Sequence, residues 1–294
     1  MKYSLSVILS MLGWMNLMAQ DFELAGVRYL NYPTTKANDT DSSEFSIQEF
    51  GGFFNIPTIL NKDSTSIMLN GLGYAQLRIN TLDNPVPVDG KNIILHSVSY
   101  RFSFIRKFND KWSFIGMLEP TLASDFKSNL SSDDLVVQSL AMVSAKINSN
   151  FLIGGGLAYT TRFGDPRIIP VVPIKYTSKK HRINALLPTK LVYAYQVNSK
   201  VDIGFKAIVN GANFNITGYS NDLAEINKIN YTRGNIGPVL YYKPKKIFSI
   251  ELSGGLSTNR TFRLVDINNK SYNNNASTEA FFNIGIVVKP STYK

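Results

Sequence analysis

Apolar and polar side chains alternate along residues 92–107 with a period of two positions. Successive side chains of a β-strand point to opposite faces, so this segment is expected to be a strand with one apolar and one polar face. A half-buried strand of a soluble β-sandwich alternates in the same way, so the rest of the chain must separate the two architectures. The apolar positions are Ile94, Val98, Tyr100, Phe102 and Phe104, and the polar ones are Ser97, Ser99, Arg101 and Ser103.

Strand-like segments continue along the whole chain, joined alternately by short turns and by longer polar loops. This rhythm is typical of an up-and-down outer-membrane barrel, with tight turns at one rim and long loops at the other. A sandwich with Greek-key connections would not keep it. The expected strands are residues 22–32, 44–59, 66–80, 92–107, 111–123, 135–147, 151–161, 167–177, 181–187, 190–197, 201–216, 229–243, 247–264 and 278–288. The short turns are residues 61–65, 108–110, 148–150, 198–200 and 244–246, and the long loops are residues 33–43, 81–91, 124–134, 217–228 and 265–277.

The number of strands depends on the segment around Pro188. If residues 181–187 and 190–197 are two short strands, the total is about 14, an even number that brings both ends of the chain to the same rim. If they form an inward excursion, about 12 strands remain. Pro188 and Thr189 would make an outer connection far shorter than the others. Both counts stay open at this point.

The N-terminus has the pattern of an export signal. Lys2 precedes an apolar run from Leu5 to Met18, and Ala19 and Gln20 then precede the first acidic residue, Asp21. We expect residues 1–19 to be a signal peptide and residues 20–294 to form one barrel domain. No later apolar stretch is long enough for a membrane-spanning helix, and the mean hydropathy is −0.06. The chain has no cysteine, which excludes disulfides, thiolate metal sites and a cysteine nucleophile.

The formal net charge of +10 does not indicate nucleic-acid binding, because the basic residues are scattered over strands and turns. Parity instead places several charged side chains on the barrel interior, where an unpaired basic excess would line an anion-preferring passage. Opposite charges that pair across the interior would plug it instead. The residues expected to line the interior are Arg78, Arg101, Glu119, Lys146, Asp202, Lys206, Arg233 and Glu251.

No catalytic, cofactor or metal site is expected. His96 and Ser97 are adjacent on one strand and therefore point to opposite faces, and His181 lies in a basic turn. A barrel-embedded hydrolase is therefore the second alternative. Asp39 with Asp41, and Asp133 with Asp134, lack the spacing of a calcium loop and are expected to be solvated loop acids. The glycines of residues 154–156 favour close strand packing over phosphate binding.

The chain resembles a domain-of-unknown-function family of Gram-negative outer-membrane β-barrels. The resemblance rests on the early Ala-Gly-Val strand at residues 25–27, the Pro-containing strand pair of residues 167–197, the Leu-Leu-Pro element at residues 186–188, and residues 198–214. It implies a fold and a location in the outer membrane, and it brings no activity or catalytic residues.

The sequence thus predicts an all-β, transmembrane, antiparallel up-and-down barrel of the Gram-negative outer membrane. Its expected function is non-enzymatic passage or binding of small solutes through a polar, net-basic lumen. The first alternative is a closed structural or surface-binding barrel of the cell envelope. Outer-membrane lipids and small solutes are the expected partners.

Overall fold

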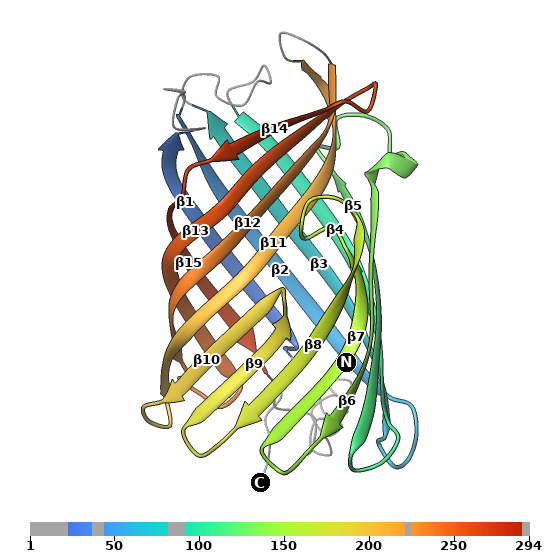
Figure 1. The fold of residues 1–294 in the computed structure, drawn as a ribbon, viewed down its shortest axis with the longest axis vertical. Helices are drawn as coiled ribbons and strands as arrows, with labels where there is room; N and C mark the ends of the chain where they lie inside the picture. Colours follow the sequence, from blue (N-terminus) through green and yellow to red (C-terminus); the bar gives the residue numbers. More distant parts are fainter. Residues whose placement is uncertain (1–22, 37–43, 82–91, 221–224, 290–294) are drawn as a thin grey trace, which may run out of the picture.

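The computed structural model is an all-β barrel (Figure 1) and describes residues 23–36, 44–81, 92–220 and 225–289. The expected export signal and its cleavage site lie outside these residues. Among the described residues, no helix is long and apolar enough to cross a membrane. The strands are β1 (Ala25–Lys36), β2 (Glu44–Ile59), β3 (Ser66–Thr81), β4 (Asn92–Lys107), β5 (Trp112–Ser124), β6 (Leu135–Lys146), β7 (Phe151–Thr160), β8 (Arg167–Thr177), β9 (His181–Leu187), β10 (Lys190–Gln196), β11 (Val201–Ser220), β12 (Glu225–Tyr242), β13 (Phe248–Asp266), β14 (Ser271–Ala276) and β15 (Glu279–Val288), with a short 3-10 helix, η2 (Ser132–Asp134).

The strands close into a ring because the first and last are paired. β1 pairs antiparallel with β15, from Ala25 opposite Val288 onward. β14 and β15 both pair with β13. β14 pairs with residues 260–265, toward the long-loop end, and β15 pairs with residues 248–257, toward the short-turn end, so the two act as one interrupted strand. The described part of the chain therefore forms a closed antiparallel barrel, which confirms the predicted fold, and its 14 strands match the first of the two expected counts. The alternative of 12 strands is wrong, because β9 and β10 pair as a hairpin within the wall.

The pleat of β4 turns its even positions outward, as expected. Val98, Tyr100 and Phe102 are exposed, whereas Ser103, at an odd position, is buried. Exposed apolar side chains recur on the other strands, for example Phe54 on β2 and Leu157 on β7. A belt of this kind suits contact with lipid hydrocarbon.

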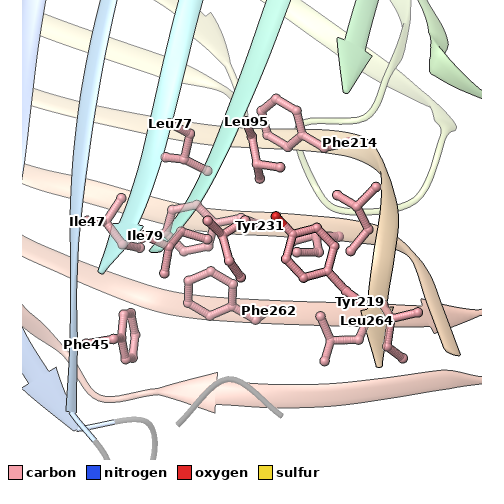
Figure 2. Close-up of a cluster of buried hydrophobic side chains, with 14 of the residues drawn as sticks. Phe45, Ile47, Leu77, Ile79, Leu95, Phe214, Tyr219, Tyr231, Phe262 and Leu264 are labelled. Carbon is pink, nitrogen blue, oxygen red and sulfur yellow. The ribbon is translucent and has the colours of Figure 1, made fainter. Parts of the chain in front are cut away.

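The interior is not uniformly polar, which corrects the expectation of a polar lumen. Toward the long-loop end, inward side chains from opposite walls meet in an apolar cluster (Figure 2), and many of them are fully buried. Phe45 and Phe262 pack edge to face with their ring centroids 5.2 Å apart, and Tyr231 stacks on Phe262 at 4.4 Å. The cluster consists of Tyr32, Phe45, Ile47, Leu77, Ile79, Ile93, Leu95, Ala123, Phe214, Ile216, Tyr219, Ile226, Ile229, Tyr231, Phe262, Leu264 and Phe281.

Two expected outer loops are largely strand. β11 and β12 continue into residues 217–220 and 225–228, so the expected loop at residues 217–228 is wrong over most of its length. The asparagine-rich segment expected as an exposed loop forms β14, which pairs with the outer part of β13. Tertiary pairing outweighs the weak β-propensity of asparagine here.

The wall changes partners halfway up β11. β10 pairs with β11 only as far as Lys190 opposite Ile208, and Asn215 then pairs with Ser124 of β5 in parallel orientation. Figure 1 shows β9 and β10 confined to the lower half, while β11, β12 and β13 rise to the upper rim. The upper ring is therefore narrower than the lower one, which allows side chains to fill it.

The glycines of β7 permit close packing on β6, in line with the sequence interpretation. A Cβ on Gly154 would lie 2.2 Å from the Val143 carbonyl oxygen, and one on Gly156 would lie 2.3 Å from the Ala141 carbonyl oxygen. A Cβ on Gly155 would meet nothing within 4 Å. Gly155 is therefore a site where substitution should be tolerated.

We expect Leu95→Ala to lower the free energy of unfolding by about 2–5 kcal/mol, because Leu95 is fully buried in the apolar cluster. Leu72→Ala on the outer face is the control, since Leu72 is 45% exposed in the bare barrel. Urea unfolding of both variants in lipid vesicles measures the difference. Equal losses would contradict an interior cluster that stabilises the fold.

Candidate functional site

The lower half of the interior carries ion pairs between strands that are not adjacent in sequence. The Lys206 ammonium of β11 lies 2.6 Å from a carboxylate oxygen of Glu251 on β13, and both side chains are largely buried. The Asn283 amide donates to the same Glu251 oxygen at 2.8 Å. Asp202, which is fully buried, pairs with Arg182 and with Lys243, whose Nζ lies 2.7 Å from its carboxylate.

Arg233 links the ion-paired residues of the lower interior, here called the charged band, to the apolar cluster. Its guanidinium pairs with Glu49 of β2, and its Nε donates to the Tyr32 hydroxyl at 2.6 Å. The guanidinium also lies 4.7 Å from the centroid of the Tyr231 ring. Buried Arg260 is held in a related way, with its guanidinium 5.3 Å from the centroid of the Phe45 ring. Arginine suits such positions because its planar group combines ion pairing with stacking on aromatic rings.

A cavity of about 230 Å³ lies within the barrel, against β2 to β6 and the middle of β11. Small or uncharged polar residues form much of its lining, including Ser97, Thr121 and Gln138. Glu119 is the charged residue of the lining, and it pairs with Arg101 at 2.5 Å. The cavity therefore offers hydrogen-bonding groups and apolar surface rather than a free charge.

A second cavity, of about 270 Å³, lies between β6, β7 and the upper parts of β11 and β12. Leu135, Val137 and Tyr159 line it and belong to the exposed apolar side chains of the barrel's outer surface. Asp133 and Lys228 line it at the outer rim, 3.2 Å apart. The two cavities share the lining residues Val136, Thr161, Asn213 and Phe214.

Six of the eight residues predicted to line the interior take part in the ion pairs described above. These residues are Arg101, Glu119, Asp202, Lys206, Arg233 and Glu251.

The placement of Arg78 corrects the prediction. Arg78 is exposed and lies opposite outward-facing Ile94, while its neighbours Leu77 and Ile79 are buried in the apolar cluster. At this end of β3 the apolar side chains point inward and the charged one points outward, the opposite of what the sequence analysis assumed. Lys146 is exposed at the end of β6, beside a short turn.

Sequence reasoning missed several partners of the buried charges. Glu49, Arg182 and Lys243 complete three of the ion pairs. Glu49 shares the parity of Phe45 and Ile47, so period-two analysis of β2 could have found it once that face was known to be internal. Arg182 and Lys243 stand next to turns, where parity is not informative without the pairing register.

The outer rim contains a clasp, formed by residues of the β5–β6 connection and of β11. The Asn215 amide donates to an Asp134 carboxylate oxygen at 3.0 Å, and the Thr217 N–H donates to Asp125 at 3.2 Å. Asp134 also caps η2 through the Ser131 N–H at 2.7 Å. The expectation that Asp134 is a solvated loop acid is therefore wrong, since it is almost fully buried.

The pKa of the Asp134 carboxyl reflects this environment. Burial alone would raise the pKa, but hydrogen bonds from the Ser131 N–H, the Asn215 amide and the Ser124 hydroxyl hold it below its usual value. The ionised form thus stabilises the clasp at neutral pH.

The two histidines contact tyrosines. The Nδ1 atom of His96 lies 2.8 Å from the Tyr74 hydroxyl, and that of His181 lies 3.0 Å from the Tyr193 hydroxyl. Neither contact provides the acid and nucleophile of a hydrolase. Among the residues that the structure describes, no group of three His, Cys, Asp or Glu side chains could hold a metal ion. Asp39 and Asp41 lie outside the described residues.

Residues 18–289 match the family described as a domain of unknown function, DUF6268. The chain belongs to the DUF6268 family. This membership confirms the resemblance noted from the sequence and covers the whole described barrel. No curated protein matches the chain.

Solved structures similar to this DUF6268 chain are outer-membrane barrels of low sequence identity. An outer-membrane channel from Pseudomonas putida F1 is 10% identical with a TM-score of 0.46, over 92% of this chain and 98% of that one. The P. putida toluene transporter TodX is 9% identical with a TM-score of 0.44, over 92% and 89%. The translocator domain of the autotransporter NalP from Neisseria meningitidis is 10% identical with a TM-score of 0.40, over 97% and 93%. These scores are too low to support an inference about function.

We expect the buried pair of this DUF6268 barrel to show strong coupling between its two members. Glu251→Leu or Lys206→Leu alone should cost about 3–5 kcal/mol, because each leaves one buried charge without its partner. The double variant should cost less than the sum of the two. Unfolding in lipid vesicles measures all three, with exposed Lys146→Leu as the control, and additive losses would contradict a desolvated pair.

The clasp should loosen only in strong acid. A carboxyl whose folded pKa is depressed contributes stability above its ordinary pKa of about 4, and this contribution is lost as the pH falls through the lower folded value. A spin label on Asn129→Cys, in this cysteine-free chain, should therefore gain mobility only below about pH 4. Asp134→Asn should make the label mobile at neutral pH, whereas Asp133→Asn should not. A label whose mobility rises near neutral pH in the parent protein would refute this assignment.

Proposed function

We propose that this barrel lies in the outer membrane and provides a non-enzymatic site for the binding and passage of small, uncharged solutes. The observation that carries the proposal is the central cavity of about 230 Å³, lined by hydroxyl, amide and apolar groups. Sites for small molecules are commonly concave and mostly apolar, with a few polar groups that fix orientation. The outer belt of exposed apolar side chains supports lipids of the outer membrane as its surroundings.

The pairing of the interior charges argues against an anion-preferring passage. Lys206, Arg182, Lys243 and Arg233 each lie beside a carboxylate, so the net basic charge of the chain does not translate into free cations at these positions. An ion that crossed this band would have to displace a partner that is already desolvated. Uncharged solutes avoid that cost.

A closed structural barrel is the second candidate. The apolar cluster favours it, because side chains from opposite walls fill the outer half of the interior (Figure 2). In that case the ion pairs would stabilise the barrel without any solute. The contacts of His96 and His181 give no support to the hydrolase alternative.

The two candidates differ in what crosses a membrane that contains the purified barrel. We expect proteoliposomes to take up glycerol and arabinose faster than protein-free vesicles, while a planar bilayer in potassium chloride shows little steady current. Thr121→Trp, which fills the inner cavity, should slow uptake. Val143→Trp on the outer surface is the matched control. If folded protein accelerates the uptake of neither solute and passes no current, the barrel is closed.

A further inference from the structure

The wall of the barrel has a place where strand pairing stops above the β9–β10 hairpin. β8 and β9 pair only as far up as Val172 opposite Leu187, and β10 and β11 only as far as Lys190 opposite Ile208. On the described part of β11, strand pairing on this edge resumes at Asn215, with β5 rather than β8. The upper parts of β8 and β11 are therefore not joined as neighbouring strands.

The β7–β8 connection, residues 161–166, covers this place. Its backbone lies against β11: a Cβ on Gly211 would be only 2.4 Å from the Arg162 carbonyl oxygen. The Arg162 guanidinium donates to the Asn210 side chain at 3.3 Å. Gly164 has a φ of +96°, which an L side chain rarely adopts, and its position faces Thr232 of β12. The connection thus rests on the strands rather than pairing with them.

The two cavities adjoin each other beside this connection. They share four lining residues, Val136, Thr161, Asn213 and Phe214. One cavity faces the interior of the barrel, and the other is bordered by Leu135, Val137 and Tyr159 of the outer surface. Thr161 belongs to the connection itself, so its displacement would alter the boundary between the cavities.

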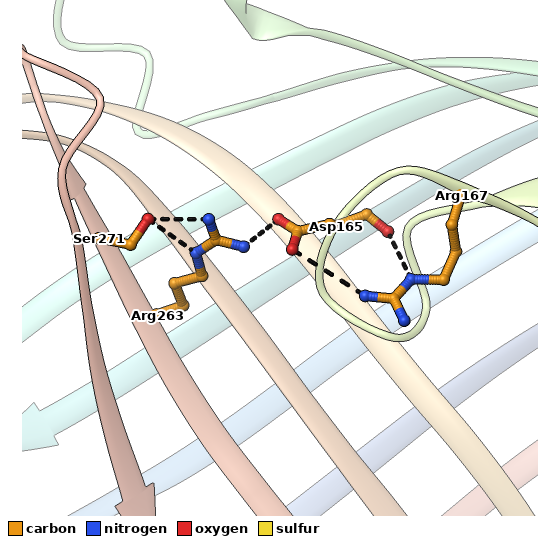
Figure 3. A network of polar contacts seen from close by, with 4 residues as sticks. All are labelled: Asp165, Arg167, Arg263 and Ser271. Atoms are coloured by element: carbon orange, nitrogen blue, oxygen red, sulfur yellow. Dashed lines mark hydrogen bonds and ion pairs between the residues drawn. The ribbon is translucent and has the colours of Figure 1, made fainter.

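A latch of partly exposed ion pairs holds the connection in place (Figure 3). Asp165 pairs with Arg263 of β13 and with Arg167 at the start of β8. Arg263 is oriented by two hydrogen bonds to the Ser271 hydroxyl, at 3.0 and 2.8 Å. The Asp165 and Arg167 side chains are about half exposed, so water competes for these contacts. Such pairs contribute little free energy, and the latch can open at small cost.

We infer that the β7–β8 connection gates a side opening through which uncharged solutes with an apolar part move between the central cavity and the membrane-facing groove. The inference rests on the proposed function and specifies its route and its class of solute. The apolar cluster fills the outer half of the interior, whereas the side route is lined by apolar groups and by asparagine and threonine side chains. Its charged lining residues, Asp133, Asp165 and Lys228, are ion-paired. A charged solute would have to compete with these ion pairs, whereas an uncharged one would not.

The absence of native cysteine allows a direct test by labelling. A reporter, Ser97→Cys, is placed in the central cavity on β4, away from the gate. Purified barrels in liposomes are treated with N-phenylmaleimide, which is uncharged and partly apolar. In a separate experiment they are treated with a methanethiosulfonate reagent that carries a negatively charged sulfonate group. Gly211→Ala should force the connection away from β11, and Asp165→Asn should release the latch. Gly155→Ala is the matched control, because a Cβ there meets nothing within 4 Å.

We expect N-phenylmaleimide to label the reporter about two- to fivefold faster in Asp165→Asn and about tenfold faster in Gly211→Ala, with no change in Gly155→Ala. The charged reagent should not be accelerated. Asp165→Asn keeps the test valid if Gly211→Ala fails to fold. Unchanged rates in the folded variants would overturn the gate, and equal acceleration of both reagents would overturn the uncharged, membrane-side route.

The labelling result is separable from the proposed function. Accelerated labelling without uptake of glycerol or arabinose by the parent protein would uphold the side opening while refuting solute passage. Uptake that is unaffected by the gate variants, together with unchanged labelling, would retain solute passage and refute this route.

Discussion

The structure depends on satisfying the backbone hydrogen bonds of every strand in a setting where lipid offers no partner. A closed ladder meets this requirement, and pairing of β1 with β15 completes it at the short-turn end. Farther up, β9 and β10 end and β11 loses its neighbour. The chain responds by bringing β11 toward β5, with side chains of the β5–β6 connection and the β7–β8 connection supplying the remaining contacts.

This change of partners organises the interior into two levels. The narrow upper ring brings opposite walls close enough for Phe45, Tyr231 and Phe262 to pack as a core. The wider lower part keeps charged side chains, and each carboxylate there is matched by a basic group from another strand. Arg233 belongs to both levels, since it pairs with Glu49 and lies over the Tyr231 ring. A single narrowing of the wall thus separates a charged region from an apolar one, with the central cavity beside them.

The same narrowing leaves β6 and β7 standing outside the upper part of β11. The groove between them is bordered by lipid-facing side chains on one side and by Asn213 and Asn230 on the other. In an uninterrupted 14-stranded wall no such groove would form, because each strand edge would be covered by its neighbour. The outer ends of β6, β7 and β11 are therefore where this barrel departs from a simple cylinder.

The sequence by itself determined the barrel and narrowed its strand number to two counts, 14 and 12, because strands follow from a period of two. It also indicated that charges such as Arg101 and Lys206 point inward, because a charge that faces lipid is costly. It failed at Arg78, where parity reports that two faces differ but not which one is internal. It also failed at the asparagine-rich β14, where tertiary pairing with β13 outweighs the weak β-propensity of asparagine. Only the tertiary structure decided that Glu49 meets Arg233 and that Asn215 meets Ser124, because these residues are far apart in sequence. Such contacts arise from the register of closure and the local width of the ring, and neither quantity is encoded in any single segment.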